Sequence, residues 1–518
     1  MFHKVIKNND GVISPERSVS FIDFISTPAE PKKPAPIQES LDQDYVRITQ
    51  DRVKAIGNAY FKPLSPILTT NIEDITSSDQ QFEIFWQLVE QYHQILENKL
   101  NSMILKALNK ATSGSDIIKT YKGSMISPHL FNSTKGVMDV KGKRKEVNLF
   151  NLNDYLGLAK NRKVMAAAQA AIVLYGTGGT GSRLIRGTTD LHVLLEEEIT
   201  KFKGLGRKNI STITFPAGYM ANLALMGIFR DGKGTMILDK KAHQSLLDGC
   251  SLSGVERKRF AHNDMVQLRN MIKGIREKCG LDHKICIVVD GVYSMDGDLC
   301  PLVEIRDIAK EYNALIILDD AHATGTVGES GRGTLEYYNI QDWEDQIIIM
   351  GTLGKSFGSI GGFVTARADF IEALKYTANQ VIFSTSLAPP SLASSLMALK
   401  SIIENPNLVY KLREKTARLK AGITSLGLNI GNTKTHILPL ITGTGRNELL
   451  QQEDAATILL SEYLLEKGFY APPIISGKAV RVPRLRISTS ALHSTEQIDD
   501  FIALLRDARD KGLISSVE

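Results

Sequence analysis

The sequence predicts an α/β protein in which a mostly parallel central sheet lies between helices on both faces. Two continuous apolar runs, ICIVVDGV at 285–292 and ALIILDDAH at 314–322, are typical of strands that helices cover on both sides. An amphipathic helical pattern at 302–313 separates them. This order of strand, helix and strand favours parallel pairing.

The other elements follow the same alternation along the chain. A short strand and turn at 212–218 precede a helical segment at 219–229. Near the C-terminus, weaker strands alternate with helices, which indicates a smaller α+β domain. The remaining strands are expected at 234–239, 346–352, 361–366, 436–441 and 484–490.

The first 110 residues differ from the rest. They include a proline-rich segment at 26–40, typical of an extended linker, and apolar residues at helical spacing over 82–108, which predict one amphipathic helix. This extension is a candidate for peripheral membrane or carrier-protein contact. The expected organisation is an N-terminal extension (1–110), an arm (111–170), a large cofactor-binding domain (171–400) and the C-terminal α+β domain (401–518).

Composition narrows the classes of function. A net charge of +5 over 518 residues does not supply the concentrated basic face that nucleic acid favours. The four cysteines show no C-x-x-C spacing, so no metal site or disulfide framework is expected, and a reducing cytoplasm is the simplest location. No uninterrupted apolar run reaches the ~18 residues of a membrane-spanning helix.

Two glycine-rich stretches resemble nucleotide-binding motifs but fail on spacing or context. In GTLGKS, at 351–356, only two residues separate the first glycine from the Gly-Lys pair, whereas a P-loop has four. The G-x-G-x-x-G pattern at 176–181 follows a helical segment, whereas the dinucleotide-binding motif follows a strand. Lys355 in the first stretch is therefore better interpreted as a reactive amine.

Polar residues after successive strands predict a site for pyridoxal 5′-phosphate (PLP). Lys355 can form a Schiff base with an aldehyde cofactor, and Asp319, at the end of a buried strand, can keep a pyridine nitrogen protonated. Gly218 and Tyr219 open a helix whose amides suit a phosphate, and Thr352 adds a hydroxyl. His243 can stack on the ring. Taken alone, Asp319 also suits a helix cap, and His243 and His322 also suit ordinary polar roles.

From about residue 112 onward the chain resembles the α-oxoamine synthases, PLP enzymes of the aspartate-aminotransferase fold (fold type I). The resemblance is nearly continuous and does not include the first 110 residues. The motifs that carry it are NDYLGLA, GTGSRLIRGTTDLHVLLE, GYMANLA, HQSLLDG, DGVYSMDGD, DDAHATGTVGESGRG, GTLGKSFGSIGGF, FSTSLAPP and LRISTSALH.

The resemblance implies a role for each matched residue. Lys355 is the Schiff-base lysine and general base, and Asp319 meets the pyridinium nitrogen. The other residues in or near the cofactor site are His322 and Ser294 near the phenolic oxygen, His243 on the ring, and Thr352, Gly218 and Tyr219 at the phosphate. Arg486 grips the amino-acid carboxylate, and Asn153 lies on the substrate side. The resemblance also implies a homodimer in which FSTSLAPP, at 383–390, contributes to the neighbour's phosphate site.

The implied reaction is a decarboxylative condensation of an amino acid with an acyl thioester of coenzyme A or acyl carrier protein. Three motifs look most like serine palmitoyltransferases, which implies L-serine and a long-chain acyl-CoA as substrates. The alternatives within the family are an 8-amino-7-oxononanoate synthase, a glycine C-acetyltransferase or a carrier-dependent secondary-metabolite synthase. An inactive scaffold subunit is the alternative of another class, against which the presence of Lys355 argues.

Overall fold

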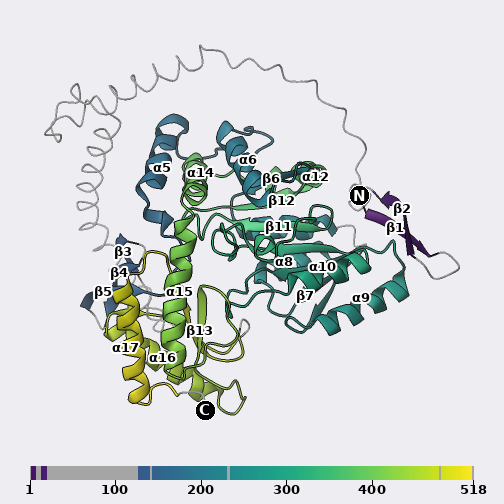
Figure 1. Cartoon of the computed structure of the whole chain (residues 1–518). Coiled ribbons are helices and arrows are strands. Elements are labelled where there is room, and N and C mark those ends of the chain that lie inside the picture. Colours follow the sequence, from purple (N-terminus) through teal and green to yellow (C-terminus); the bar gives the residue numbers. More distant parts are fainter. Residues whose placement is uncertain are drawn as a thin grey trace, which may run out of the picture.

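The computed structural model describes residues 2–7, 13–19, 126–132, 134–140, 143–229, 234–477 and 480–515. The linker at 26–40 and the helix expected at 82–108 lie outside these residues. Near the N-terminus, β1 (Phe2–Lys7) and β2 (Ile13–Val19) form an antiparallel pair with each other (Figure 1).

A seven-stranded sheet in the order β6-β12-β11-β10-β9-β7-β8 forms the centre of the molecule. β8, β7, β9, β10 and β11 pair in parallel, and β12 runs antiparallel to both of its neighbours. The strands are β6 (Ile210–Phe215), β7 (Thr235–Asp239), β8 (Glu256–Phe260), β9 (Ile285–Asp290), β10 (Leu315–Asp319), β11 (Ile347–Thr352) and β12 (Gly362–Arg367).

Helices cover both faces of this sheet, which explains the continuous apolar runs of its inner strands. In β10, Leu315 and Ile317 belong to one hydrophobic cluster, whereas Ile316 and Leu318 belong to another. Because successive side chains of a strand point to opposite faces, every position of such a strand is buried. One cluster includes side chains of α7 (Gly218–Met226), α8 (Gln244–Ser253) and α12 (Ala368–Thr377), and the other those of α9 (Met265–Cys279) and α10 (Leu302–Glu311).

Two smaller sheets lie beside the central one (Figure 1). β13 (Ile437–Ile441), β16 (Arg484–Ser488) and β15 (Pro473–Ile474) form an antiparallel sheet. The other sheet has the order β14-β5-β4-β3 and combines β3 (Ile126–Asn132), β4 (Lys135–Val140), β5 (Lys143–Leu149) and β14 (Phe469–Tyr470).

The remaining helices surround these sheets. α14 packs against α5 and α6, and α15 packs against α17. Their bounds are α5 (Arg162–Tyr175), α6 (Asp190–Gly204), α11 (Thr334–Tyr337), α13 (Asn379–Ile382), α14 (Pro389–Glu404), α15 (Asn407–Ser425), α16 (Leu450–Glu466) and α17 (Thr495–Asp510), with short 3-10 turns at Leu158–Lys160 and Gly227–Phe229. In the described part of the chain, no helix is both long and apolar enough to cross a membrane.

Candidate active site

Most of the residues expected at the site follow the carboxyl ends of neighbouring strands. Asp319 is the last residue of β10, and Lys355 lies three residues after the end of β11. Ser294 and His243 follow β9 and β7. Since these four strands are parallel, their carboxyl ends share one edge of the sheet, where α/β proteins bind ligands.

Asp319 is held in a fixed orientation inside this edge. Its side chain is buried, with the residue only 4% exposed. Asn222, on α7, donates from Nδ2 to its Oδ2 at 2.8 Å, and the backbone N–H of Ala321 donates to Oδ1 at 3.1 Å. These bonds orient the carboxyl group, as a partner for a ring nitrogen requires.

Lys355 has an unusually low pKa for a lysine. Burial is the main cause and lowers the pKa to about 8, while the charge of Asp319 opposes this and that of Arg486 adds to it. Asp290, at the end of β9, is a second carboxyl in this group. Burial and, next, the charge of Asp319 raise the pKa of Asp290 well above its usual range. A lysine with such a pKa is neutral in a useful fraction of molecules near neutral pH.

The start of α7 and the turn after β11 lie against each other. No side chain caps α7, whose first residue is Gly218. A Cβ on Gly218 would stand 3.3 Å from Cβ and Oγ1 of Thr352, and one on Gly362 would stand 2.6 Å from Cα of Gly218. Thr352 Oγ1 donates to the carbonyl of Gly361 at 2.9 Å. The uncapped amides of α7 suit a phosphate group, and Thr352 can donate to the same group if its hydroxyl turns away from Gly361.

Tyr155 connects several of the expected residues, although the sequence did not single it out. Its hydroxyl lies 2.7 Å from Nδ1 of His322 and 2.9 Å from Oδ1 of Asn153. Arg486 donates from Nη2 to Asn153 at 3.3 Å and to Tyr155 at 3.5 Å. Burial lowers the pKa of His322 well below its usual value, and Lys355 adds to this effect, so His322 is neutral. The structure therefore brings Asn153, His322 and Arg486 together through one phenol.

Hydrogen bonds hold two nitrogens of the Arg486 guanidinium, Nε and Nη2, and leave the third, Nη1, for a substrate. Its Nε donates to the carbonyl oxygen of Ser294 at 2.7 Å, in the loop after β9. The neighbouring Arg484 pairs with Asp296 of the same loop at 2.8 Å. Nη1 of Arg486 makes no hydrogen bond to any described residue, so it can receive a carboxylate.

His243 and Tyr219 lie at the same sheet edge, and both side chains are hydrogen-bonded to other side chains of the protein. His243 caps α8, its Nδ1 lying 2.7 Å from Oγ of Ser245, and its backbone N–H donates to Asp290 at 3.1 Å. The exposed Tyr219 donates its hydroxyl to Asp248 on α8. Its backbone N–H, in the first turn of α7, is therefore the group it offers to a phosphate.

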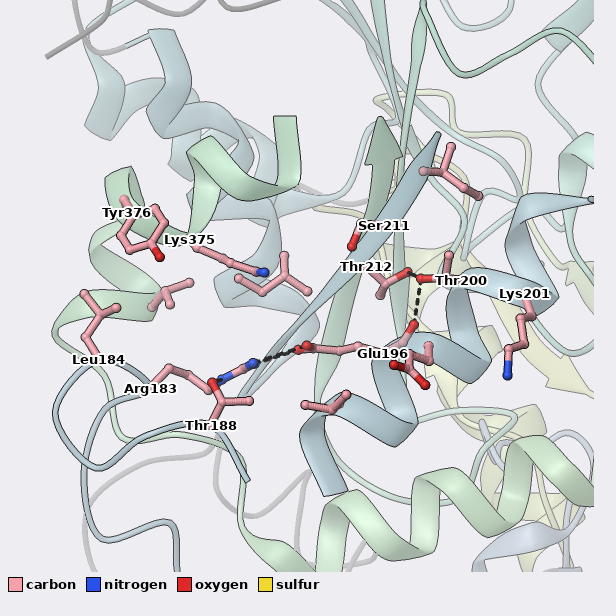
Figure 2. A pocket seen from close by; sticks show the side chains of 15 residues that line it. Arg183, Leu184, Thr188, Glu196, Thr200, Lys201, Ser211, Thr212, Lys375 and Tyr376 are labelled. Carbon is pink, nitrogen blue, oxygen red and sulfur yellow. Dashed lines mark hydrogen bonds and ion pairs between the residues drawn. The ribbon is translucent and has the colours of Figure 1, made fainter. Parts of the chain in front are cut away.

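A separate pocket of about 510 Å³ lies at the β6 edge of the sheet and contains none of the expected site residues. Figure 2 shows Arg183 and Glu196 pointing toward each other there, with 2.6 Å between Nη1 and Oε1. Glu196 also accepts hydrogen bonds from the backbone and hydroxyl of Thr214. This pair links the loop after α5 to α6 and β6, and we assign it no part in the chemistry.

The site as a whole fits a cofactor that carries an aldehyde, a pyridine ring and a phosphate. Lys355 supplies an amine, Asp319 an oriented carboxylate, and the uncapped α7 with Thr352 a phosphate cradle. Asn222, Asp290 and Tyr155 complete the arrangement and were missed from the sequence. Asn222 offered a weak signal, because it stands four residues after Gly218 and so on the same side of the helix.

The chain is similar to known proteins over most of its length. The family model described as "Aminotransferase class I and II" matches residues 145–505. The chain is 38% identical over 372 residues to a putative 8-amino-7-oxononanoate synthase of Desulforudis audaxviator, covering 71% of this chain and 91% of that protein. It is 35% identical over 364 residues to the serine palmitoyltransferase of Sphingobacterium spiritivorum, covering 70% and 86%. Among solved structures, Sphingomonas wittichii serine palmitoyltransferase matches with a TM-score of 0.69 and 27% identity, covering 81% of this chain and all of that one.

Proposed function

Because the chain belongs to the α-oxoamine synthases, within the class I and II aminotransferase family, we propose that it condenses an amino acid with an acyl thioester. Carbon dioxide and the thiol leave, and an α-aminoketone is the product. The observation that carries this proposal is a buried, low-pKa lysine, Lys355, whose pKa is influenced by the charges of both Asp319, an oriented side chain, and Arg486, which has one nitrogen left for a substrate. The predicted α/β fold and the predicted family are both confirmed.

The enzyme uses PLP. This cofactor supplies an electron sink for the electron pair that stays on the α-carbon of the amino acid when its proton is removed. The following residues would hold the cofactor: Lys355 covalently, Asp319 at the ring nitrogen, His243 on the ring face, Ser294 and His322 near the phenolic oxygen, and Thr352, Gly218 and Tyr219 at the phosphate. Two neutral groups, His322 and Tyr155, would face the phenolic oxygen without adding charge.

The protein's own side chains bind the amino acid and move its proton. Nη1 of Arg486 binds the carboxylate, while Asn153 and the carbonyl of Ser294 keep the guanidinium plane fixed. Lys355 accepts the α-proton at Nζ, because burial lowers its pKa to about 8 and so leaves part of the amine neutral near neutral pH. Holding the base, Lys355, and the bound amino acid in one fixed geometry supplies much of the rate.

We further propose a homodimer with shared active sites. Ile185 and Phe383 are large apolar side chains that are 88% and 80% exposed. Their segments are joined, because the backbone N–H of Ser386 donates to the carbonyl of Gly181 at 2.9 Å. Exposed apolar side chains on adjoining segments favour burial against a second copy. The segment at 383–390 would then reach the partner's phosphate site.

The preferred substrates are L-serine and a long-chain acyl-CoA, as for a serine palmitoyltransferase. An 8-amino-7-oxononanoate synthase is the second candidate, because enzymes of both names are similar to this chain to nearly the same degree. The deciding experiment offers the PLP-loaded protein serine, alanine and glycine, each with acetyl-, pimeloyl- and palmitoyl-CoA. Mass spectrometry of the product identifies the pair. A PLP-loaded protein that turns over no amino acid with any thioester contradicts the proposal and favours a scaffold subunit.

A further inference from the structure

His262, two residues after the end of β8, lies between two carboxylates from different parts of the fold. Its Nδ1 is 2.9 Å from Oδ1 of Asp239, the last residue of β7, and its Nε2 is 2.6 Å from Oδ2 of Asp298. An ionised carboxylate only accepts hydrogen bonds, whereas a neutral imidazole has one nitrogen that donates and one that accepts. Both contacts are hydrogen bonds only when each ring nitrogen carries a proton, so the geometry favours the charged form of the ring.

The surroundings of His262 keep the ring charged. Burial disfavours the charge, but the hydrogen bonds and charges of Asp239 and Asp298 outweigh burial and raise the pKa of His262 to about 9. Two further titratable side chains lie close to this group: Tyr293, whose ring packs edge-on against the imidazole with 4.5 Å between centroids, and Cys300. Burial raises the pKa of both well above their usual range, so both are neutral. An imidazolium therefore links the two carboxylates near neutral pH.

Asp298 lies in the turn after β9 that also carries Ser294. This turn closes on itself, because the backbone N–H of Tyr293 donates to the carbonyl of Asp298 at 3.1 Å and that of Gly297 donates to the carbonyl of Tyr293 at 2.8 Å. The carbonyl of Ser294 accepts the hydrogen bond from Nε of Arg486 at 2.7 Å. The imidazole thus holds one end of a closed turn, and a carbonyl of the same turn orients the guanidinium that is expected to bind the amino acid.

Asp296 connects the same turn to two other segments. It pairs with Arg484 of β16 at 2.8 Å and with Lys241, after β7, at 3.0 Å. The lysine side chain is 39% exposed, so water screens its pair with Asp296. The side chain of His262 is only 18% exposed. On the side of β7, the more buried contact of the turn is therefore the one that Asp298 makes with the imidazole.

We propose that His262 is a positioning residue for amino-acid binding. By joining the end of β7 to the turn at 293–298, it fixes the carbonyl that orients Arg486. The inference rests on the proposed function, because it takes Arg486 as the group that binds the amino-acid carboxylate. Since His262 acts through the turn, replacing it should raise the KM for the amino acid more than it lowers kcat.

The test measures amino-acid binding apart from condensation. L-serine, L-alanine and glycine are titrated calorimetrically into the PLP-loaded protein without a thioester. His262→Gln cannot donate to both carboxylates, so affinity should fall about tenfold, the lower end of what a hydrogen bond to a charged group contributes. His262→Arg donates on several sides and should stay within about threefold of the wild type. Asp298→Asn removes the charge on the turn, should act like His262→Gln, and replaces it if that variant does not fold.

A double-mutant cycle with Arg486→Ala separates positioning from a general effect on the fold. Once Arg486 is alanine, His262→Gln should change affinity less than about twofold, because the group that it positions is gone. His283→Gln is the matched control. It makes the same substitution at the opposite end of the strands, where Nε2 of His283 lies 2.9 Å from Oγ1 of Thr235, the first residue of β7. It should bind all three amino acids as the wild type does.

The charge on His262 can be observed directly in the wild type. With ¹³C at the histidine Cε1 positions, the resonance that is missing from His262→Arg should titrate near pH 9, above the ~6.5 of an ordinary histidine. A midpoint near 6.5 overturns the proposal. So does an effect of His262→Gln that is equal in both Arg486 backgrounds, or absent with PLP content unchanged. Amino-acid affinity that Arg486→Ala itself leaves unchanged contradicts the proposed function instead.

Discussion

Lys355 has to lose a proton before it can bond to an aldehyde or act as a base. Its pKa of about 8 lies well below the ~10.4 of an exposed lysine, so the neutral amine becomes available at lower pH. We therefore expect the rate of PLP uptake by the cofactor-free protein to rise with pH up to about 8 and then to level off. Absorbance after rapid mixing, from pH 6 to pH 10, measures this rate.

Lys355→Ala is the control for that profile. It should take up no PLP that borohydride fixes to the protein, and its turnover should fall by at least 10²–10⁴-fold, the usual contribution of a positioned base. A wild-type uptake rate that keeps rising to pH 10 would show that Lys355 has an ordinary pKa. Borohydride fixation of PLP in Lys355→Ala would place the reactive amine elsewhere.

Arg486 should contribute to amino-acid binding and not to cofactor binding. Its Nε and Nη2 bind protein groups, and only Nη1 remains for a substrate carboxylate. Arg486→Lys keeps the charge but loses the planar fork, and Arg486→Ala loses both. We expect amino-acid affinity to fall in the order wild type, lysine, alanine, with PLP content unchanged. Loss of PLP from Arg486→Ala with unchanged amino-acid affinity would assign the residue another role.

The sequence singled out those candidate residues whose position follows from a strand end, such as Lys355 and Asp319, and the structure places both at one edge of the sheet. It missed those whose role depends on a contact between distant segments. Tyr155 and His322 are 167 residues apart, and Asn222 and Asp319 are 97 apart. Nothing in local spacing or polarity shows which two segments will meet, so such contacts become visible only after folding.

A buried ion pair anchors the loop between β10 and α11 to helix α6. Nζ of Lys203, near the end of α6, lies 2.6 Å from Oδ2 of Asp320 and also donates to Thr324 and to the carbonyl of Arg332. Both charged side chains are almost fully buried. The pair therefore connects α6 to the loop that follows Asp319 and carries His322, and it sets where that loop can lie.

Removing one partner of this pair should be costly. Lys203→Met leaves the Asp320 carboxylate buried without its cation, a change that typically lowers the free energy of unfolding by about 3–5 kcal/mol. Lys201→Met, on the same helix but in an exposed pair with Glu198, should cost far less. Guanidinium unfolding measures both. In the double variant Lys203→Met/Asp320→Asn, part of the lost stability should return, and equal costs for Lys203→Met and Lys201→Met would contradict this role.

In the central sheet, the strands with continuous apolar runs were predicted and the charged strand β8 was not. β9 and β10 are buried at every position, so hydrophobicity alone marks them. β8, with the sequence ERKRF, is the edge strand and is mostly exposed. Charged residues suit an edge strand because they discourage pairing with another chain. They also leave the strand without the apolar pattern from which strands are predicted.

The proposed homodimer can be tested at its two most exposed apolar residues. Ile185→Asp and Phe383→Asp each place a charge where a partner would bury an apolar side chain, so sedimentation should show a shift from dimer to monomer. Turnover should fall with it, because each site would lose the partner's 383–390 segment. Val266→Asp is the control, since Val266 is also exposed but lies on α9, away from α5 and α6 (Figure 1). Dimers that persist in both test variants would contradict the interface.

At the scale of the whole chain, the candidate site lies apart from the N-terminal extension in the sequence. Every described residue of the candidate site lies at or after Asn153, and the earliest strand of the three larger sheets, β3, begins at Ile126. The pair β1 and β2 is hydrogen-bonded only to itself among the described strands. Residues 1–110 therefore supply none of the described strands of those three sheets.

We accordingly expect the truncated protein, residues 111–518, to take up PLP and to turn over soluble short-chain thioesters at the wild-type rate. If the extension presents long chains from a membrane or a carrier protein, turnover should fall only when palmitoyl thioester is supplied on vesicles or on acyl carrier protein. Turnover of the full-length and the truncated protein is compared between these palmitoyl supplies and acetyl-CoA without detergent. A loss that is confined to the palmitoyl supplies shows that the extension acts in delivery and not in the chemistry. Failure of the truncated protein to retain PLP would show that residues 1–110 belong to the folded core and that the boundary is misplaced.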